Sequence, residues 1–457
     1  MTLYLDHAAT SPVRREVLEA MWPYLSTEFG NPSSHHSVGE SASRALLWAR
    51  EQIASIFECR PAEVIFTGGG TESNNLAIKG ISLANPRGRH LVVSAIEHPS
   101  VLESCAYLAR LHGFEVTEIG VDRDGLVHAD DVAEALRPDT TLVSVIYAHN
   151  EVGTVQPVAL IADVARSQGA AFHTDAVQAA GWLGLGRGGL PASAVTIAGH
   201  KLGAPKGVGA LILRAGTPIE PLIHGGGQER GRRSGTENVA GAVGLATALT
   251  LAEADRAVAG ARLSVVRDQF IEAVLATVPG ARLTGHSVLR LPTSASFCFE
   301  GTSGEAVLLE LEQLGVIVSS GSACAAGSSD PSTALTAMGI TPMWRTRPCA
   351  SPSATNRMLA RWLRWRRQCA LPSSACKKSA YLDRISRFQC RIVAVRQAGW
   401  GHGLNASVAL ARTQRGNRPV RSVRSPGLPR GRVDGDTHRR HGFCDGTRSR
   451  AVAVGPA

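Results

Sequence analysis

One lysine stands in a setting that suits covalent chemistry. Lys201 follows the apolar run AVTIAG (194–199) and is surrounded by glycine and proline in the segment AGHKLGAPKGVGAL (198–211). Crowding at the end of a buried strand would remove water from the amine and favour its neutral form, which is the nucleophile in Schiff-base chemistry. The alternative is an ordinary solvated lysine in a loop.

Two further segments place polar side chains directly after strand-like runs. TGGGTESNN (67–75) opens a helix, so its backbone N–H groups could hold a phosphate, or it could be a glycine turn that Thr71 caps. It lacks the Gly-Lys-Ser/Thr ending of a nucleoside-triphosphate loop, which argues against an ATPase. FHTDAVQ (172–178) carries Asp175 and Gln178 after a buried strand, where a carboxylate needs a cationic partner unless it caps a helix.

A single cysteine lies in a segment that no protein core would contain. SSGSACAAGSSD (319–330) surrounds Cys324 with serine, alanine and glycine. Small residues impose little order on a loop, so this thiol is either a functional group on a mobile segment or an incidental exposed thiol. The cysteines of the chain before residue 343 show no metal or redox spacing, and no metal site is predicted.

The elements that must position these residues alternate between strand-like and helix-like patterns from about residue 60 to residue 215. This alternation predicts a mostly parallel sheet covered by helices, whose chemistry gathers at the carboxyl ends of the strands. The expected strands are 63–67, 90–95, 141–148, 170–176, 194–199 and 209–213, and the expected helices between them are 71–84, 99–113 and 158–169.

The pattern divides the chain into three parts. We expect a large domain over 15–258 and a smaller α+β domain from 1–14 and 259–342, which carries the Cys324 loop and is truncated. A long alanine-rich helix (240–278), broken near Gly260, joins the two domains. Residues 343–457 form a basic, arginine-rich tail.

The charge of the tail differs sharply from that of the body. Residues 343–457 contain 24 basic and 4 acidic residues, which leaves 24 basic and 34 acidic residues for positions 1–342. The high overall pI therefore describes neither part and does not indicate a nucleic-acid-binding protein. The tail is either read out of frame from a GC-rich gene, and then disordered, or a genuine basic extension.

The first residues, MTLYLDHAATSP, have neither the basic start nor the apolar stretch of a signal peptide, and no apolar run approaches the roughly 20 residues of a membrane-spanning helix. We therefore expect a cytoplasmic protein without membrane contact.

Nine motifs together identify a family resemblance. They occur in the order seen in cysteine desulfurases, which are pyridoxal-phosphate enzymes of the class V aminotransferase group, and they span residues 1 to about 342. The motifs are YLDHAATSP (4–12), FGNPSSHH (29–36), GGGTESNN (68–75), EHPSV (97–101), HNEVGTVQP (149–157), HTDAVQ (173–178), GHKLGAPKGVG (199–209), GGGQERGRRSGTEN (225–238) and SSGSAC (319–324). The resemblance implies fold type I, a mostly parallel seven-stranded sheet with helices on both faces and a smaller α+β domain.

The same resemblance implies a role for each motif residue. Lys201 looks like the lysine that binds the cofactor covalently and later carries a proton. At the cofactor ring, Asp175 would contact the pyridine nitrogen, Gln178 would bind the ring hydroxyl, and His98 would stack on the ring and move protons. Gly70, Thr71 and His200 would bind the phosphate. Asn150 would lie near the cofactor oxygen and the substrate, and Thr236 would reach the phosphate of the other subunit of a homodimer.

For Cys324 the resemblance implies the catalytic thiol. It would take the sulfur atom of L-cysteine, leave L-alanine, and pass the resulting persulfide to acceptor proteins for iron–sulfur cluster assembly or thiolation. The alternatives are a related lyase or aminotransferase, such as a selenocysteine lyase, and an impaired pseudoenzyme.

Two positions depart from the family pattern. Ala198 stands where many members have a serine that binds the phosphate, which would remove about 0.5 to 1.5 kcal/mol of binding free energy. The arginine that binds the substrate carboxylate would fall beyond Pro342, where neither Arg345 nor Arg347 lies in a recognisable strand.

Overall fold

The computed structural model describes residues 2–84, 87–299, 304–319, 332–340 and 389–392. The chain divides into a unit over Met1–Gly399 and a unit over Trp400–Ala457, and all of the described residues belong to the first. Cys324, its loop and almost all of the basic tail lie outside the described residues.

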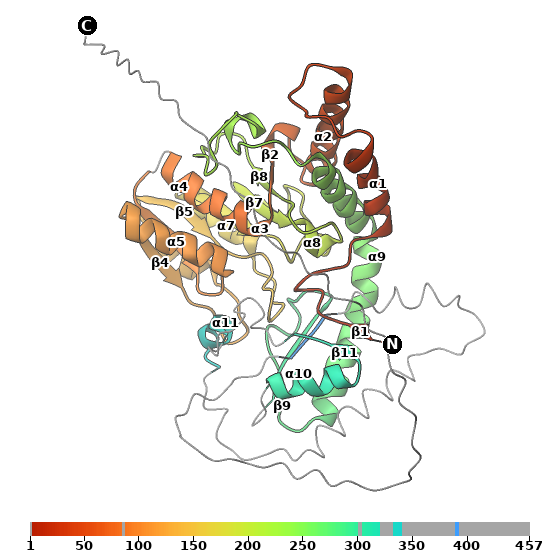
Figure 1. Cartoon of the computed structure of the whole chain (residues 1–457). Helices are drawn as coiled ribbons and strands as arrows, with labels where there is room; N and C mark the ends of the chain where they lie inside the picture. The colour runs from red at the N-terminus through yellow and green to blue at the C-terminus, as the bar shows by residue number, and fades with distance from the viewer. Residues whose placement is uncertain (1, 85–86, 300–303, 320–331, 341–388, 393–457) are drawn as a thin grey trace, which may run out of the picture. The chain divides into compact units, whose positions relative to one another are not determined.

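A seven-stranded sheet forms the centre of the first unit (Figure 1). Every strand is parallel to its neighbours except β8, which runs antiparallel to the strands on both of its sides. The order across the sheet is β2 (Val64–Thr67), β8 (Gly209–Leu213), β7 (Ala194–Ala198), β6 (Ala171–Asp175), β5 (Thr140–Ser144), β3 (His90–Ser94) and β4 (Glu115–Ile119).

Helices cover both faces of this sheet because most of its strands, including the edge strand β2, are buried on both sides. In β2, Val64 and Phe66 enter one hydrophobic cluster while Ile65 enters the other. The first cluster takes residues from α1 (Arg15–Ser26), α2 (Ser37–Ile56), α7 (Val158–Ser167) and α9 (Val239–Thr277). The second takes residues from a continuous helical stretch, made of the π-helical η2 (Leu76–Gly80) and α4 (Ile81–Ala84), and from α5 (Pro99–His112).

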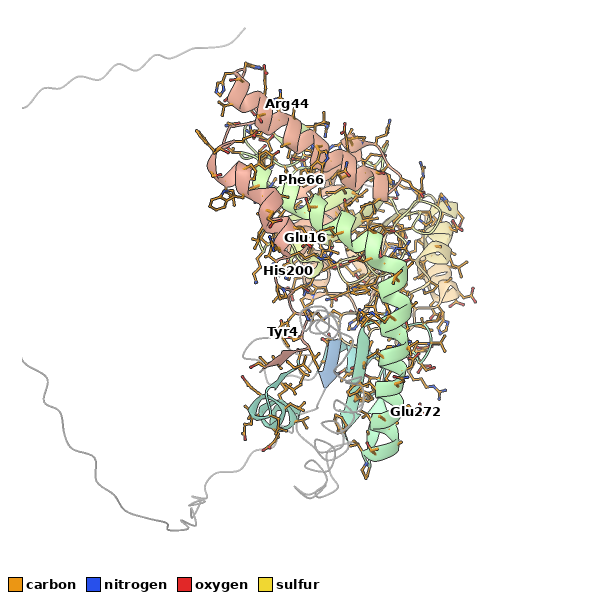
Figure 2. The ribbon with its side chains drawn as sticks, turned by 90° about the vertical axis from the view of Figure 1, so that its right-hand side faces the viewer. Tyr4, Glu16, Arg44, Phe66, His200 and Glu272 are labelled. Carbon is orange, nitrogen blue, oxygen red and sulfur yellow. The ribbon has the colours of Figure 1, made fainter. Side chains whose placement is uncertain are left out.

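The helix α9 joins this core to a second one. Its first half buries Leu249 and Ala252 in the cluster against the large sheet, and its second half buries Phe270 and Val274 in a separate cluster. Figure 2 shows α9 running from beside α1 down to the strands near Glu272. The helix therefore crosses the domain boundary that we predicted at 258/259.

The second core lies among small sheets. β10 (Ser294–Phe299) pairs antiparallel with β9 (Ala281–Leu283) and parallel with β12 (Gln389–Ile392), and β1 (Leu3–Tyr4) pairs parallel with β11 (Val316–Ile317). The remaining short helices are η1 (Pro61–Glu63), α3 (Gly70–Asn75), α6 (Ala129–Ala135), α8 (Gly199–Leu202), η3 (Glu229–Gly231), α10 (Gly304–Gln313) and α11 (Thr333–Ala337).

Several features of the structure differ from the sequence expectations, among them the strand predicted over 141–148, which ends at Ser144. The predicted break near Gly260 is wrong, because α9 is continuous over Val239–Thr277. A glycine costs a helix only about 1 kcal/mol relative to alanine, and packing on both halves outweighs that cost. Strand β4 was not predicted, and neither was β12 within the tail.

No helix in the described ranges is both long enough and apolar enough to cross a membrane.

Candidate active site

The predicted site residues gather at one edge of the large sheet. Strands β2, β3, β5, β6 and β7 all point the same way, so their carboxyl ends meet at this edge. Asp175 ends β6, Lys201 follows β7 through the short helix α8, and Gly70 follows β2. The parallel order of the sheet thus brings together residues that lie far apart in the sequence.

The amine of Lys201 is held by the N-terminal segment of the chain. Its Nζ donates to the carbonyl oxygens of Ala8 and Ala9, the latter at 2.8 Å. The amide of Gln178 donates to the same Ala8 oxygen at 3.0 Å. The motif YLDHAATSP (4–12) therefore forms one wall of the site, a contact that sequence spacing alone did not predict.

His200 is neutral at this position. Its Nδ1 lies 3.2 Å from Thr10 Oγ1. Burial, together with the positive charges of Lys201 and Lys206, lowers the pKa of His200 to about 4. The ring therefore offers an uncharged hydrogen-bonding group to the site near pH 7.

Two features of the loop after β2 favour glycine. Gly69 has φ +151°, a backbone conformation open almost only to glycine, and it precedes the first residue of α3. A Cβ at Gly70 would lie 3.0 Å from Val177 Cγ2 and 3.4 Å from Ala198 Cβ. The backbone of the loop therefore lies directly against the segments that follow β6 and β7.

Asp175 is buried and held by two donors. The amide of Asn74 donates to its Oδ2 at 2.7 Å, and the backbone N–H of Val177 donates to its Oδ1 at 2.9 Å. Asn74 also donates to Ser100 Oγ at 2.9 Å. The carboxylate consequently has a fixed orientation at the end of β6, and Asn74 links it to helix α5.

His98 caps the start of α5. Its Nδ1 accepts from the backbone N–H of Ser100 at 3.1 Å and lies 2.8 Å from Ser100 Oγ. Ser100 is thus shared between His98 and Asn74, so a short chain of hydrogen bonds connects His98 to Asp175. The motifs predict His98 and Asp175 in one site; Asn74 and Ser100 lie inside the motifs GGGTESNN and EHPSV but were not predicted as site residues.

Glu97, the residue directly before His98, is a buried acid. Its Oε1 accepts from Ser94 Oγ and from the backbone N–H of Ile146, both at 2.5 Å. Burial, with a smaller contribution from the charge of Asp175, raises the pKa of Glu97 to about 7. No role for this side chain was predicted from the sequence.

Replacing Glu97 with glutamine should make stability less dependent on pH. The unfolded carboxyl titrates near its ordinary value of 4.5 and the folded one near 7, so the folded protein binds the extra proton and loses stability as pH rises through this window. Between pH 5 and pH 8 the loss should be about 2.5 kcal/mol, and Glu97→Gln, which resembles the protonated acid, should escape it. Thermal unfolding of both proteins at several pH values measures the difference.

The matched control is Glu118→Gln on the exposed side of β4. A stability gap between the wild-type protein and Glu97→Gln that stays constant from pH 5 to pH 8 would rule out the raised pKa.

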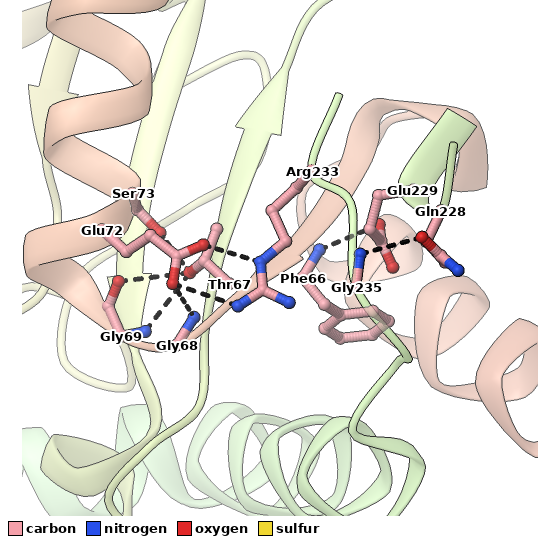
Figure 3. A network of polar contacts seen from close by, with 10 residues as sticks. All are labelled: Phe66, Thr67, Gly68, Gly69, Glu72, Ser73, Gln228, Glu229, Arg233 and Gly235. Carbon is pink, nitrogen blue, oxygen red and sulfur yellow. Dashed lines mark hydrogen bonds and ion pairs between the residues drawn. The ribbon is translucent and has the colours of Figure 1, made fainter. Parts of the chain in front are cut away.

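A polar network fastens the segment 225–238 to the glycine loop (Figure 3). Glu72 accepts from Arg233 Nε at 2.8 Å and from the backbone N–H of Gly68 at 2.7 Å. Glu229 accepts from the backbone N–H of Phe66 at 3.1 Å. The segment that carries Thr236 is therefore anchored beside the loop that carries Thr71.

Four predicted residues are not brought into this hydrogen-bonded group. Thr71 and Thr236 are exposed, and Asn150 lies half-buried in the turn that follows β5. Cys324 lies outside the described residues. Among the described residues, no cluster of three or more His, Cys, Asp or Glu side chains could hold a metal ion.

The groups at this edge fit pyridoxal phosphate. A buried carboxylate with a fixed orientation suits a protonated ring nitrogen, and an amine at the end of the neighbouring strand suits the aldehyde. A loop that favours glycine at positions 69 and 70, together with the neutral His200, suits the phosphate.

The comparisons with known proteins agree with this fit. The class-V aminotransferase profile matches residues 3–346, and the chain belongs to this family. Cysteine desulfurase IscS of Dictyoglomus turgidum is 46% identical over 341 residues, which are 74% of this chain and 86% of that protein. The solved structure "NIFS-LIKE PROTEIN" is 32% identical with a TM-score of 0.71, covering 80% of this chain and all of that one. The structure "SspA in complex with cysteine" is 36% identical with a TM-score of 0.65, covering 78% of this chain and 97% of that one.

These matches confirm the predicted family, the fold class and the cofactor, because class-V aminotransferases are pyridoxal-phosphate enzymes. The family match ends at residue 346, close to residue 342, where the sequence pattern was seen to change. The assignment of individual site residues and the domain boundaries stay predictions.

Proposed function

We propose that the chain is a pyridoxal-phosphate-dependent cysteine desulfurase that converts L-cysteine to L-alanine and carries the sulfur away as a persulfide on Cys324. The observation that supports this most strongly is the placement of Lys201 and Asp175 at the ends of the neighbouring strands β7 and β6. The names of the relatives favour this activity over the lyase alternative.

The protein residues bind and orient the cofactor. Asp175 holds the ring nitrogen, Gln178 the ring hydroxyl, and His200, Thr71 and the amide of Gly70 the phosphate. When bound, the cofactor withdraws electrons from the substrate amino acid and so weakens the bonds at its Cα and the adjacent C–S bond. The amine of Lys201 takes and returns the Cα proton, and His98 assists from the face of the ring.

Cys324 performs the sulfur transfer. Its thiolate attacks the sulfur atom of the substrate, and the new S–S bond forms as the substrate C–S bond breaks. The electron pair of that bond stays with the carbon, which gains a proton and leaves as alanine. The enzyme keeps a persulfide, which an acceptor protein for iron–sulfur cluster assembly or thiolation then takes up.

We also propose a homodimer. Helix α1 exposes Leu18, Trp22 and Leu25 at a spacing that places them on one face, and Phe29 follows directly after the helix; all four are more than half exposed. Thr236, which the family resemblance assigns to the phosphate of the other subunit, is exposed, as that role requires. Sedimentation of the purified protein as a monomer would contradict this proposal.

A cytoplasmic location agrees with the described cysteines, Cys59, Cys105 and Cys298, which are free thiols.

The experiment that tests the function uses the purified full chain and L-cysteine. We expect visible absorbance from bound cofactor, a change in that spectrum on adding L-cysteine, and equal amounts of alanine and transferred sulfur in the presence of a thiol reductant. L-serine, which lacks the sulfur atom, is the matched control substrate. Bound cofactor without alanine production would contradict the desulfurase activity and favour an impaired enzyme.

A further inference from the structure

Asn74 occupies a junction between three elements of the active site. It lies on α3, and its amide nitrogen contacts Ser100 on α5 and Asp175 at the end of β6. The side chain is almost completely buried, with 1% of its surface exposed. An amide group at such a junction can orient both of its neighbours.

The orientation of this amide is determined by its partners. A carboxylate only accepts hydrogen bonds, so the atom of Asn74 that faces Asp175 must be the NH₂ group. The carbonyl oxygen of Asn74 is left buried without a hydrogen-bond partner in the described part of the chain. A charge-assisted bond is about twice as strong as a neutral one, which explains why the amide keeps this orientation.

The bond from Asn74 also determines the direction of the hydrogen bond between Ser100 and His98. Because Ser100 Oγ accepts a hydrogen from Asn74, the hydroxyl hydrogen of Ser100 is directed to its other neighbour, His98 Nδ1, at 2.8 Å. The backbone N–H of Ser100 points to the same nitrogen at 3.1 Å. With two donors aimed at it, Nδ1 acts as an acceptor, and the proton of the neutral ring sits on Nε2.

We propose that Asn74 is a positioning residue that acts through Ser100 to fix the protonated nitrogen of His98 and, through its other hydrogen, to hold the Asp175 carboxylate. One amide group thereby positions both the Asp175 carboxylate, which is assigned to the ring nitrogen of the cofactor, and His98, which is assigned to proton movement. The roles of those two groups rest on the proposed function, whereas the direction of the hydrogen bonds follows from the contacts of Asn74 and Ser100 in the structure.

The test measures the tautomer of His98 directly. Full-length protein with nitrogen-15-labelled histidine is examined by solid-state NMR near pH 8, and the His98 signals are identified by their loss in His98→Gln. We expect the wild-type ring to carry hydrogen on Nε2 and none on Nδ1. In Ser100→Ala only the backbone N–H of residue 100 still points to Nδ1, so the hydrogen bond at Nδ1 should weaken and the resonance of this nitrogen should shift. Asn74→Ala should shift the resonance in the same direction, and Ser100→Thr should restore the wild-type resonance.

The matched control is Ser104→Ala, one turn further along α5, whose hydroxyl donates to the backbone carbonyl of Ser100 at 2.7 Å. It should keep the wild-type tautomer. A wild-type ring protonated on Nδ1, or Ser100→Ala spectra that match those of Ser104→Ala, would overturn the proposal.

Turnover supplies the second measurement. Asn74→Ala should lower kcat by about ten-fold, the effect of one hydrogen bond to a charged group, with little change in the KM for L-cysteine. An unchanged kcat in Asn74→Ala would contradict its positioning role. Because the NMR result does not depend on turnover, a protein without desulfurase activity would refute the proposed function and leave the tautomer readable.

Discussion

Replacing Cys324 with alanine is expected to abolish alanine production from L-cysteine while leaving the bound cofactor and its visible absorbance intact. The residues assigned to the cofactor, which include Lys201 and Asp175, lie on the large sheet and keep their hydrogen bonds when the thiol is lost. Binding and electron withdrawal should therefore proceed, but no thiolate remains to receive the sulfur atom. We expect turnover to fall by at least about 10³-fold, as when other catalytic nucleophiles are removed.

Cys298, another cysteine of residues 1–342, provides a matched control. Cys298 is mostly buried, and burial raises the pKa of its thiol to about 11, so this thiol stays protonated near pH 7. Cys298→Ala should keep its turnover. After brief exposure to L-cysteine, mass spectrometry should find one added sulfur on the peptide that contains Cys324. Persistent alanine formation by Cys324→Ala would disprove its nucleophile role.

The sequence predicted the sheet because most of its strands are buried on both faces. Strands such as β3 and β7 appear as continuous apolar runs between helical segments, a pattern that few other structures produce. Strand β4 (EVTEI) lies at the edge of the sheet, and Glu115, Val116 and Glu118 are exposed. An edge strand needs no continuous apolar run, so composition did not reveal it.

The sequence predicted those site residues that directly follow a recognisable strand. Asp175 and Lys201 each follow a recognisable strand, and parallel strands must bring such positions together. The link from Asn74 to Asp175 spans 101 positions and depends on how α3 packs against β6. The contact of Lys201 with Ala9 spans 192 positions. Neither contact follows from local spacing, because both depend on tertiary packing.

Replacing Lys201 should have the other large effect. Its amine is the atom assigned to the covalent bond with the cofactor, and the same amine is assigned to the movement of the Cα proton. Lys201→Ala loses both roles, so turnover should fall by at least about 10³-fold even in excess cofactor. Borohydride treatment should fix the cofactor to Lys201 in the wild-type protein, and peptide mass spectrometry should find no such adduct in the variant.

Two further variants separate chemistry from structure. Lys201→Arg keeps a positive charge and donors for the carbonyls of Ala8 and Ala9, but a guanidinium is always protonated and cannot form the covalent bond. It should retain the fold, bind the cofactor reversibly and remain inactive. Lys206→Ala removes an exposed lysine of the same loop and should keep both the adduct and the turnover. A borohydride-stable adduct at any other lysine in the wild-type protein would show that the amine at the end of β7 is not the reactive one.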